Sequence, residues 1–504
     1  MADGNRTEEK RGGMYDHILK YTGVFGGVQG LITLVNLIRT KIVAVLLGTV
    51  GFGINDSFNK TLNLVRSTTD LGIPFSAVRD VSANYDNENT AFLRDSVLVT
   101  RSWALLTAIA GALLCIVLSP LFSLWAFDGD RGYTLSFILL SPSVAFSTIA
   151  GGEMAVLKGM RKLKEIALSQ LFTVLLSLCI SIPVFYYLRL RGLVLSLVLV
   201  SFATMVLTCM YSFRAIPYRV RVFSGAVLRS GADMVRLGIF FTLAAFFGSG
   251  AFSVIANYLM KNAGAELLGA YSAGYALMNY LGMFVFSAME SDYFPRLSSS
   301  VGDRQTAGVM LNRQAEVSLL LIMPMIVCFL VFLDPIVRLL LSDKFCVAIP
   351  MARIAVLSLF FKAMTQPMAY LSLAKGDSRT YLIQEFLYDI FLVVAVIFCY
   401  RFRGLEMTGF AITLAGIFDL VVVGTIVRLR YGLHLTRDTW LLAAALLLPM
   451  LLTYFSVSFL NGWLAWTVSL LLLAVAVVLS YAGLKRRTVA FDAIMTKLRK
   501  KLGR

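Results

Sequence analysis

The sequence predicts an all-α polytopic membrane protein with about 14 transmembrane helices, built as two six-helix lobes in parallel repeat plus two C-terminal helices. Hydrophobic residues make up 58% of the 504 positions, charged residues only 15%, and the mean hydropathy is +0.78. Long apolar runs recur along nearly the whole chain, and no polar stretch between them is long enough to fold as a soluble domain. Basic residues also concentrate in alternate connections, as the positive-inside rule requires.

Each predicted helix is an apolar run long enough to cross a bilayer, which takes about 20 residues. The connections between these runs are short and polar. The expected spans are residues 18–46, 52–74, 98–126, 133–157, 165–188, 192–213, 233–259, 266–290, 314–341, 347–373, 379–400, 404–428, 440–460 and 463–484.

The arginines and lysines set the expected orientation, with both termini in the cytoplasm. The net charge of +17 therefore reflects membrane topology and does not indicate a nucleic-acid partner. Opposite connections hold few basic residues. The basic residues expected on the cytoplasmic side are Arg79, Arg94, Arg101, Lys158, Arg161, Lys162, Lys164, Arg214, Arg219, Arg221, Arg229, Arg296, Arg304, Arg313, Arg428, Arg430 and Arg437.

The predicted domain organisation follows from these spans. A polar cytoplasmic tail without a signal-peptide cleavage site is followed by the two lobes, an extra helix pair and a basic tail. The expected bounds are 1–17 for the N-terminal tail, 18–225 for the first lobe, 226–430 for the second lobe, 431–484 for the extra pair and 485–504 for the C-terminal tail.

An internal repeat supports the two lobes. Short matches recur in the same order and at a nearly constant offset along the chain. Because each lobe has six helices, both would insert the same way up, related by an axis along the membrane normal, with a substrate cavity between them. The matches pair Ser82 with Ser298, Thr90 with Thr306, Leu118-Ser-Pro120 with Leu333-Asp-Pro335, Lys158-Gly159 with Lys375-Gly376, and Arg189-Leu-Arg191-Gly192 with Arg401-Phe-Arg403-Gly404.

Cations inside the first two spans indicate an anionic ligand. They are Arg39 and Lys41 in the first span and Lys60 and Arg66 in the second. An ionised side chain in hydrocarbon costs at least about 2.5 kcal/mol, and arginine can hold phosphate oxygens bidentately. The alternatives are that Arg66 pairs with Asp70, one turn away, and that Lys41 extends to the outer interface.

Acidic residues in the second lobe are candidates for a coupling-ion site. Glu385 and Asp389 lie one turn apart and repel each other unless a proton or cation is bound, and Asp419 follows in the next span. A salt bridge to Lys362 or Arg353 is the structural alternative. With two histidines and no metal-ligand spacing among six cysteines, the sequence predicts no metal site and no cofactor other than a coupling proton or sodium ion.

The first two spans carry a family resemblance. Ile38-Arg39-Thr-Lys41 through Gly48, Asn63-Leu-Val-Arg66 and Asp70-Leu-Gly72-Ile resemble the Wzx-type O-antigen flippases of the multidrug/oligosaccharidyl-lipid/polysaccharide (MOP) exporter superfamily. Leu268-Gly269-Ala-Tyr271 resembles the repeat of the turn after Gly48. The same stretches are similar to lipid II flippases, whose cavity arginines match Arg39 and Arg66. A third arginine of that family has no counterpart in Gly274-Tyr275-Ala276-Leu277.

The resemblance implies a substrate, an undecaprenyl-pyrophosphate-linked oligosaccharide repeat unit, moved across a bacterial inner membrane for O-antigen, capsule or exopolysaccharide assembly. Its pyrophosphate requires cations and its sugars require a hydrated cavity, while the lipid tail can stay among membrane lipids. The resemblance also implies a polysaccharide polymerase and a chain-length regulator as partners.

Other classes of function remain open at this point. A multidrug exporter of the same superfamily would bind organic cations and favour an acidic first lobe, whereas this one is basic. A polysaccharide polymerase or ligase needs catalytic groups at a water-facing surface, and the predicted outer loops are short and lack histidine. A scaffold role has no specific feature in its favour.

Overall fold

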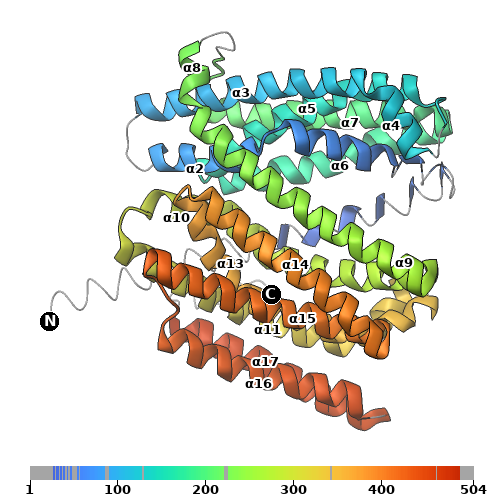
Figure 1. Cartoon of the computed structure of the whole chain (residues 1–504), viewed down its shortest axis with the longest axis vertical. Helices are drawn as coiled ribbons and strands as arrows, with labels where there is room; N and C mark the ends of the chain where they lie inside the picture. Colours follow the sequence, from blue (N-terminus) through green and yellow to red (C-terminus); the bar gives the residue numbers. More distant parts are fainter. Residues whose placement is uncertain are drawn as a thin grey trace, which may run out of the picture. The chain divides into compact units, whose positions relative to one another are not determined.

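The computed structural model describes residues 27, 28, 30–32, 34–36, 38, 39, 42, 43, 46, 47, 51, 54, 55, 57–85, 90–127, 130–220, 225–340, 343–460 and 462–487 (Figure 1). Over this part of the chain the fold is almost entirely helical and contains no strand. Two compact units are present, an N-terminal unit (Gly27–Leu243) and a C-terminal unit that begins at Ala244. They divide inside a helix, somewhat after the lobe boundary that the sequence places at 225.

The N-terminal unit is built around three helices that pack in series. Its α3, α5 and α7 lie side by side, α2 covers α5, and α6 packs on α7. Residues 57–69 are also helical. The elements are α2 (Ile73–Tyr85), α3 (Thr90–Val117), α4 (Ser119–Ala126), α5 (Thr134–Gly159), α6 (Leu163–Leu188), the 3-10 turn η1 (Arg189–Gly192), α7 (Leu193–Ala215), α8 (Gly225–Ser230) and the start of α9 (Ala232–Ala288).

The C-terminal unit repeats this packing and adds a helix pair. Here α11, α13 and α15 pack in series, α10 covers α13, and α14 packs on α15. The extra helices α16 and α17 pack on α11 and on each other. The elements after α9 are η2 (Met289–Tyr293), α10 (Phe294–Ser300), α11 (Arg304–Leu340), η3 (Asp343–Ala348), α12 (Ile349–Ala355), α13 (Ser358–Ala374), α14 (Ser378–Arg403), α15 (Leu405–Ile426), η4 (Val427–Tyr431), α16 (Arg437–Phe459) and α17 (Gly462–Arg487).

Membrane-spanning segments dominate both units. The described residues contain nine helices long and apolar enough to cross a bilayer, or ten if α12 and α13, bent by 49°, form one broken span. One of the nine, Leu163–Ala215, is 53 residues long and holds both α6 and α7, so it exceeds a single crossing. Helix α9, 57 residues, is broken at Gly264. The expected total of fourteen stays a prediction, because much of the first span lies outside the described residues.

The internal repeat is visible in the helix bounds. Helices α6 and α14 are 26 residues each, so Leu163 matches Ser378 at one end and Leu188 matches Arg403 at the other. Helix α5 and the pair α12–α13 keep the same offset, from Thr134 and Ile349 to Gly159 and Ala374. The two units therefore share the lengths of these helices and the order of their packing pairs, which is the repeat that the sequence predicts. The axis that relates the lobes stays a prediction.

Two turns show that the repeat extends to backbone conformation. Met160-Arg161-Lys162 and Lys375-Gly376-Asp377 have matching torsions, with central φ values of 54° and 71°. Their three N–H groups donate to carbonyls four, three and five positions back in both turns. Met160 is therefore the equivalent of Lys375, and the expected match of Lys158-Gly159 with Lys375-Gly376 is wrong by one half-turn of helix.

The next turn explains why the offset changes later in the chain. Arg189 ends α6 with φ 48° and ψ −129°, and Gly404 ends α14 with φ 67° and ψ −142°, at the same offset as the helices before them. The first repeat then inserts η1 before α7, whereas α15 starts directly after Gly404. Gly192 and Gly404 both precede the next helix, but Gly404 matches Arg189 in backbone conformation, which corrects the expected pairing.

A tight turn interrupts the second predicted span. Asp70 accepts a hydrogen bond from the Gly72 N–H at 3.0 Å, and both Leu71 and Gly72 have positive φ. Gly238 of α9 lies directly against the Leu71 carbonyl and the Gly72 backbone, where a Cβ has no room. Phe75 and Phe241 stack beside this contact, with ring centroids 3.9 Å apart. The Asp70-Leu-Gly72 motif thus forms a turn against which α9 packs closely at Gly238.

We expect Gly238→Ala to destabilise the N-terminal unit by about 1–3 kcal/mol, because its methyl group must displace backbone atoms. Thermal unfolding of the purified protein measures the change. Gly250→Ala is the matched control, since it lies in the same helix and a Cβ there meets nothing within 4 Å. Equal unfolding temperatures for the two variants would contradict the close approach at Gly238.

Candidate functional site

Arg39 lies in the N-terminal unit and bonds a neutral hydroxyl group. Its guanidinium donates to the Ser181 hydroxyl of α6 at 3.2 Å. Ser196 of α7 donates to the same hydroxyl at 3.3 Å. Both serines are buried, whereas Arg39 is partly exposed. Among the described residues no carboxylate pairs with Arg39, so its charge is not neutralised there.

Arg66 does not pair with Asp70, the alternative that the sequence left open. Both side chains are described, and no ion pair joins them. The buried carboxylate of Asp70 instead accepts the Gly72 N–H in the turn after the helix. Asp70 and Arg66 still attract each other electrostatically, although they form no ion pair. Arg66 is partly exposed, and no side-chain hydrogen bond to it is found in the described part of the chain.

Of the two lysine candidates, the structure describes only Lys60. Lys60 is exposed at the start of the same helix as Arg66. Lys41 lies outside the described residues. The convergence of these cations with Arg39 on one ligand stays a prediction.

In the C-terminal unit the three acidic candidates share one environment. Glu385 and Asp389 of α14 and Asp419 of α15 interact electrostatically with one another and with Lys362 of α13. Tyr381, one turn before Glu385, donates a hydrogen bond to its carboxylate. The three carboxylates and the Lys362 ammonium therefore influence one another electrostatically.

Neither proposed salt bridge forms in this group. The Lys362 ammonium lies 5.9 Å from the Phe286 ring centroid, and no described carboxylate is within ion-pair distance of it. Arg353 instead pairs with Asp334. The salt-bridge alternative is therefore wrong for the described residues, although Lys362 still attracts the three carboxylates electrostatically.

Asp389 has a buried carboxylate oxygen without a hydrogen-bond partner among the described residues. Its side chain is only 9% exposed, and this oxygen is Oδ2. It faces Gly248 of α9, where a Cβ would stand 3.7 Å from Oδ2. A buried carboxylate oxygen beside a residue without a side chain can accept a proton or a small cation. No cluster of three potential metal ligands is found in the described residues.

The sequence did not predict a buried ion pair that the structure shows in the N-terminal unit. Arg101 of α3, expected on the cytoplasmic side, is 3% exposed and bonds Glu153 of α5 at 2.9 Å. Ser212 of α7 donates to Glu153 at 2.6 Å. Arg101 also donates to the Ile216 and Pro217 carbonyls. The signal was the presence of one acidic residue inside the predicted span 133–157, which requires a partner.

In the C-terminal unit, hydrogen bonds to α11 rather than a buried ion pair hold the equivalent segment, which precedes α16. Asn312 on α11 accepts from the Thr436 N–H at 2.7 Å and from the Thr439 hydroxyl at 3.0 Å. Glu316, which takes the place of Arg101 in the second repeat, also accepts from Thr439 at 3.0 Å. In the N-terminal unit, α3 thus bonds the segment that follows α7. In the C-terminal unit, α11 bonds the segment that follows α15 and η4.

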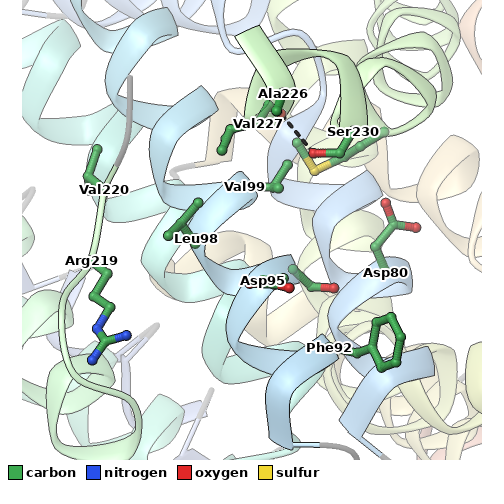
Figure 2. Close-up of a pocket in the computed structure, with 12 residues that line it drawn as sticks. Asp80, Phe92, Asp95, Leu98, Val99, Arg219, Val220, Ala226, Val227 and Ser230 are labelled. Carbon is green, nitrogen blue, oxygen red and sulfur yellow. Dashed lines mark hydrogen bonds between the residues drawn. The ribbon is translucent and has the colours of Figure 1, made fainter. Parts of the chain in front are cut away.

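Polar pockets open beside both anchored connections. In the N-terminal unit a cavity of about 780 Å³ is lined by Asp80, Asp95 and Arg219, and Figure 2 shows Arg219 standing apart from the two carboxylates. Burial raises the pKa of Asp80, Arg79 opposes this rise, and Asp233 adds to it. The related cavity of the C-terminal unit, about 770 Å³, is lined by Arg304, Asn312 and other residues. Both pockets carry mixed charge and neither matches the predicted sites.

The helical repeat, the long apolar spans and the ionisable groups held among them define a multi-pass membrane protein. Solved structures with this fold are transporters of the MOP superfamily. A MATE family multidrug resistance transporter in an outward-facing conformation has a TM-score of 0.70 at 12% identity, covering 83% of this chain and 96% of that one. A mutant of the Vibrio cholerae MATE transporter VcmN has a TM-score of 0.68 at 14% identity, covering 84% and 99%.

A third structure is a MOP superfamily transporter from Pyrococcus furiosus, in which reverse polarity of the binding pocket suggests a different function. Its TM-score is 0.69 at 13% identity, covering 83% of this chain and 96% of that one. The family model of polysaccharide biosynthesis proteins matches residues 42–350. This chain belongs to that family, and its fold is that of the MOP superfamily transporters. No curated protein matches it.

We expect Glu153→Gln to cost about 3–5 kcal/mol of stability, because it leaves the Arg101 charge buried without a counterion. Asp80→Asn is the matched control. It breaks the Arg79–Asp80 pair, whose side chains are 20% and 32% exposed, and should cost no more than about 1 kcal/mol. Thermal unfolding in the same detergent compares the two, and similar losses would show that the buried network is not critical.

Proposed function

We propose that this protein is a flippase that moves undecaprenyl-pyrophosphate-linked oligosaccharide repeat units from the inner to the outer leaflet of the bacterial inner membrane by alternating access. Membership of a polysaccharide biosynthesis family and the MATE-like transporter fold support a lipid-linked sugar as cargo. The polysaccharide polymerase and chain-length regulator that act on such units are the proposed partners, and both termini are proposed to be cytoplasmic.

The observation that carries the proposal is the difference between paired and unpaired arginines. Arg101 and Arg353 pair with Glu153 and Asp334. Arg39 and Arg66 have no ion-pair partner in the described residues, although both belong to helices expected within the membrane. An uncompensated cation in this setting is costly, and an anionic ligand would offset the cost. A pyrophosphate with several oxygens suits the planar donors of arginine.

A multidrug exporter of the same superfamily remains the second candidate. Its substrates are organic cations, which Arg39 and Arg66 would repel. Arginine charge does not adapt by deprotonation, so the repulsion would persist throughout the cycle. The fold alone is shared with the MATE transporters, and the charge of these helices favours an anionic cargo.

Replacing Arg39 with Ala should abolish complementation of a strain that lacks the gene, while the protein stays inserted and folded. Arg39→Lys should restore only part of the export, because an ammonium keeps the charge but loses the fork. Lipid-linked repeat units accumulating in the inner leaflet measure the loss.

Arg131→Ala is the control, an exposed arginine on a predicted outer connection. Full complementation by Arg39→Ala, at membrane levels equal to wild type, would remove Arg39 from the pyrophosphate site. Transport of organic cations by the wild type, without accumulation of lipid-linked sugar in the deletion strain, would favour the second candidate.

The acidic group of the C-terminal unit is proposed to bind the coupling ion. Glu385, Asp389 and Asp419 share one ammonium, so at least part of their charge is uncompensated. Protonation or sodium binding relieves this repulsion, and its release restores it. Such a change in local charge can bias two conformations of the transporter.

Asp389→Asn should make transport into proteoliposomes respond less to a proton or sodium gradient than wild type does. Glu385→Gln and Asp419→Asn test the other two members. Glu406→Gln is the control, because Glu406 is exposed in the first turn of α15. Wild-type gradient dependence in all three variants would exclude this group as the coupling site.

A further inference from the structure

An apolar groove runs along the C-terminal unit between α13, α15 and α16. Its volume is about 640 Å³, within the range typical of small-ligand sites. Residues at helical spacing on α15 and η4 form its floor, namely Ile417, Val421, Gly424 and Arg428. From Ile417 to Arg428 the helix rises about 16 Å, so the groove is long and narrow.

The groove has a cationic, aromatic end. Arg428, His434 and Trp440 lie there, whereas Phe361 and Ile417 line the opposite end. The positive-inside rule assigns the basic end to the inner leaflet, and a half-exposed tryptophan is typical of the membrane interface. The apolar part of the groove therefore extends from headgroup level into the hydrocarbon core.

Arg428 differs from two basic residues near it, Arg430 and Arg304. Arg430 pairs with Asp377, and Arg304 donates to the Gly432 carbonyl. No hydrogen bond or ion pair engages the Arg428 guanidinium within the described part of the chain, and the side chain is exposed. Its charge is therefore available to a ligand that occupies the groove.

We propose that this groove binds an anionic glycerophospholipid of the inner leaflet, with one acyl chain along α15 and the phosphate on Arg428. An acyl chain matches the apolar lining and the length, and the phosphate matches the guanidinium and the indole N–H. The undecaprenyl chain of a carrier lipid is much longer than the groove. The site is independent of the proposed cargo, because it requires only membrane phospholipid.

Two substitutions separate the headgroup from the chain. Arg428→Gln removes the charge and keeps a polar side chain. Gly424→Leu places a side chain in the groove, where a Cβ meets nothing within 4 Å, so the helix should fold normally. Arg437→Gln is the matched control, an exposed arginine at the start of α16 that does not line the groove.

The test measures binding of phosphatidylglycerol and phosphatidylcholine to the delipidated full-length protein by native mass spectrometry, with thermal unfolding as a second readout. Wild type and Arg437→Gln should prefer phosphatidylglycerol. Arg428→Gln should weaken its binding about tenfold, as expected for one charge-assisted hydrogen bond. Gly424→Leu should reduce binding of both lipids.

Three results would overturn the proposal. The first is wild-type affinity for phosphatidylglycerol in both Arg428→Gln and Gly424→Leu. The second is an equal loss in Arg437→Gln and Arg428→Gln, which indicates diffuse electrostatic attraction. The third is displacement of phosphatidylglycerol by undecaprenyl phosphate at lower concentration, which would assign the groove to the carrier lipid. Normal unfolding of each variant without lipid distinguishes these results from misfolding.

Discussion

The buried pair between Arg101 and Glu153 is the interaction on which the N-terminal unit depends. It joins α3 to α5, and through Ser212 and the Ile216 and Pro217 carbonyls it also fixes the end of α7. In a helical bundle surrounded by lipid, apolar contacts between helices gain little over contacts with lipid tails, so polar contacts and close packing set the arrangement. A charged pair with several hydrogen bonds is compatible with this environment, and one of its members alone is not.

The same constraint separates structural charges from candidate functional ones. Arg101 and Arg353 are neutralised by carboxylates, and Asp70 is occupied by a backbone N–H. Arg39 bonds a single hydroxyl, and Asp389 keeps an unsatisfied oxygen among the residues that the structure describes. These two exceptions lie in different units and have opposite charge. In the proposed function, a basic site for cargo and an acidic site for a coupling ion use the two halves of one duplicated fold for different tasks.

The repeat shows how far duplication constrains structure when residues diverge. Arg161 and Gly376 hold the same left-handed turn, although only glycine adopts it without strain. Both turns make the same three backbone hydrogen bonds. The two helices that each turn joins therefore determine its backbone conformation. Glu316, at the repeat position of Arg101, preserves the role of an anchor with the opposite charge. The spacing between equivalent helix ends is thus better preserved than the residue types at equivalent positions. Near both turns, the short sequence motifs paired residues that are not structurally equivalent.

The sequence by itself determined the class of fold, the long apolar spans, the duplication and the residues with costly charges, because hydropathy and charge act residue by residue along the chain. It did not determine which charges are compensated. Asp70 is one turn from Arg66 but bonds Gly72, whereas Arg101 finds Glu153 52 residues away. Pairing of this kind depends on which helices become neighbours, and the groove beside Arg428 exists only because α13, α15 and α16 meet. Only the tertiary structure decides such contacts.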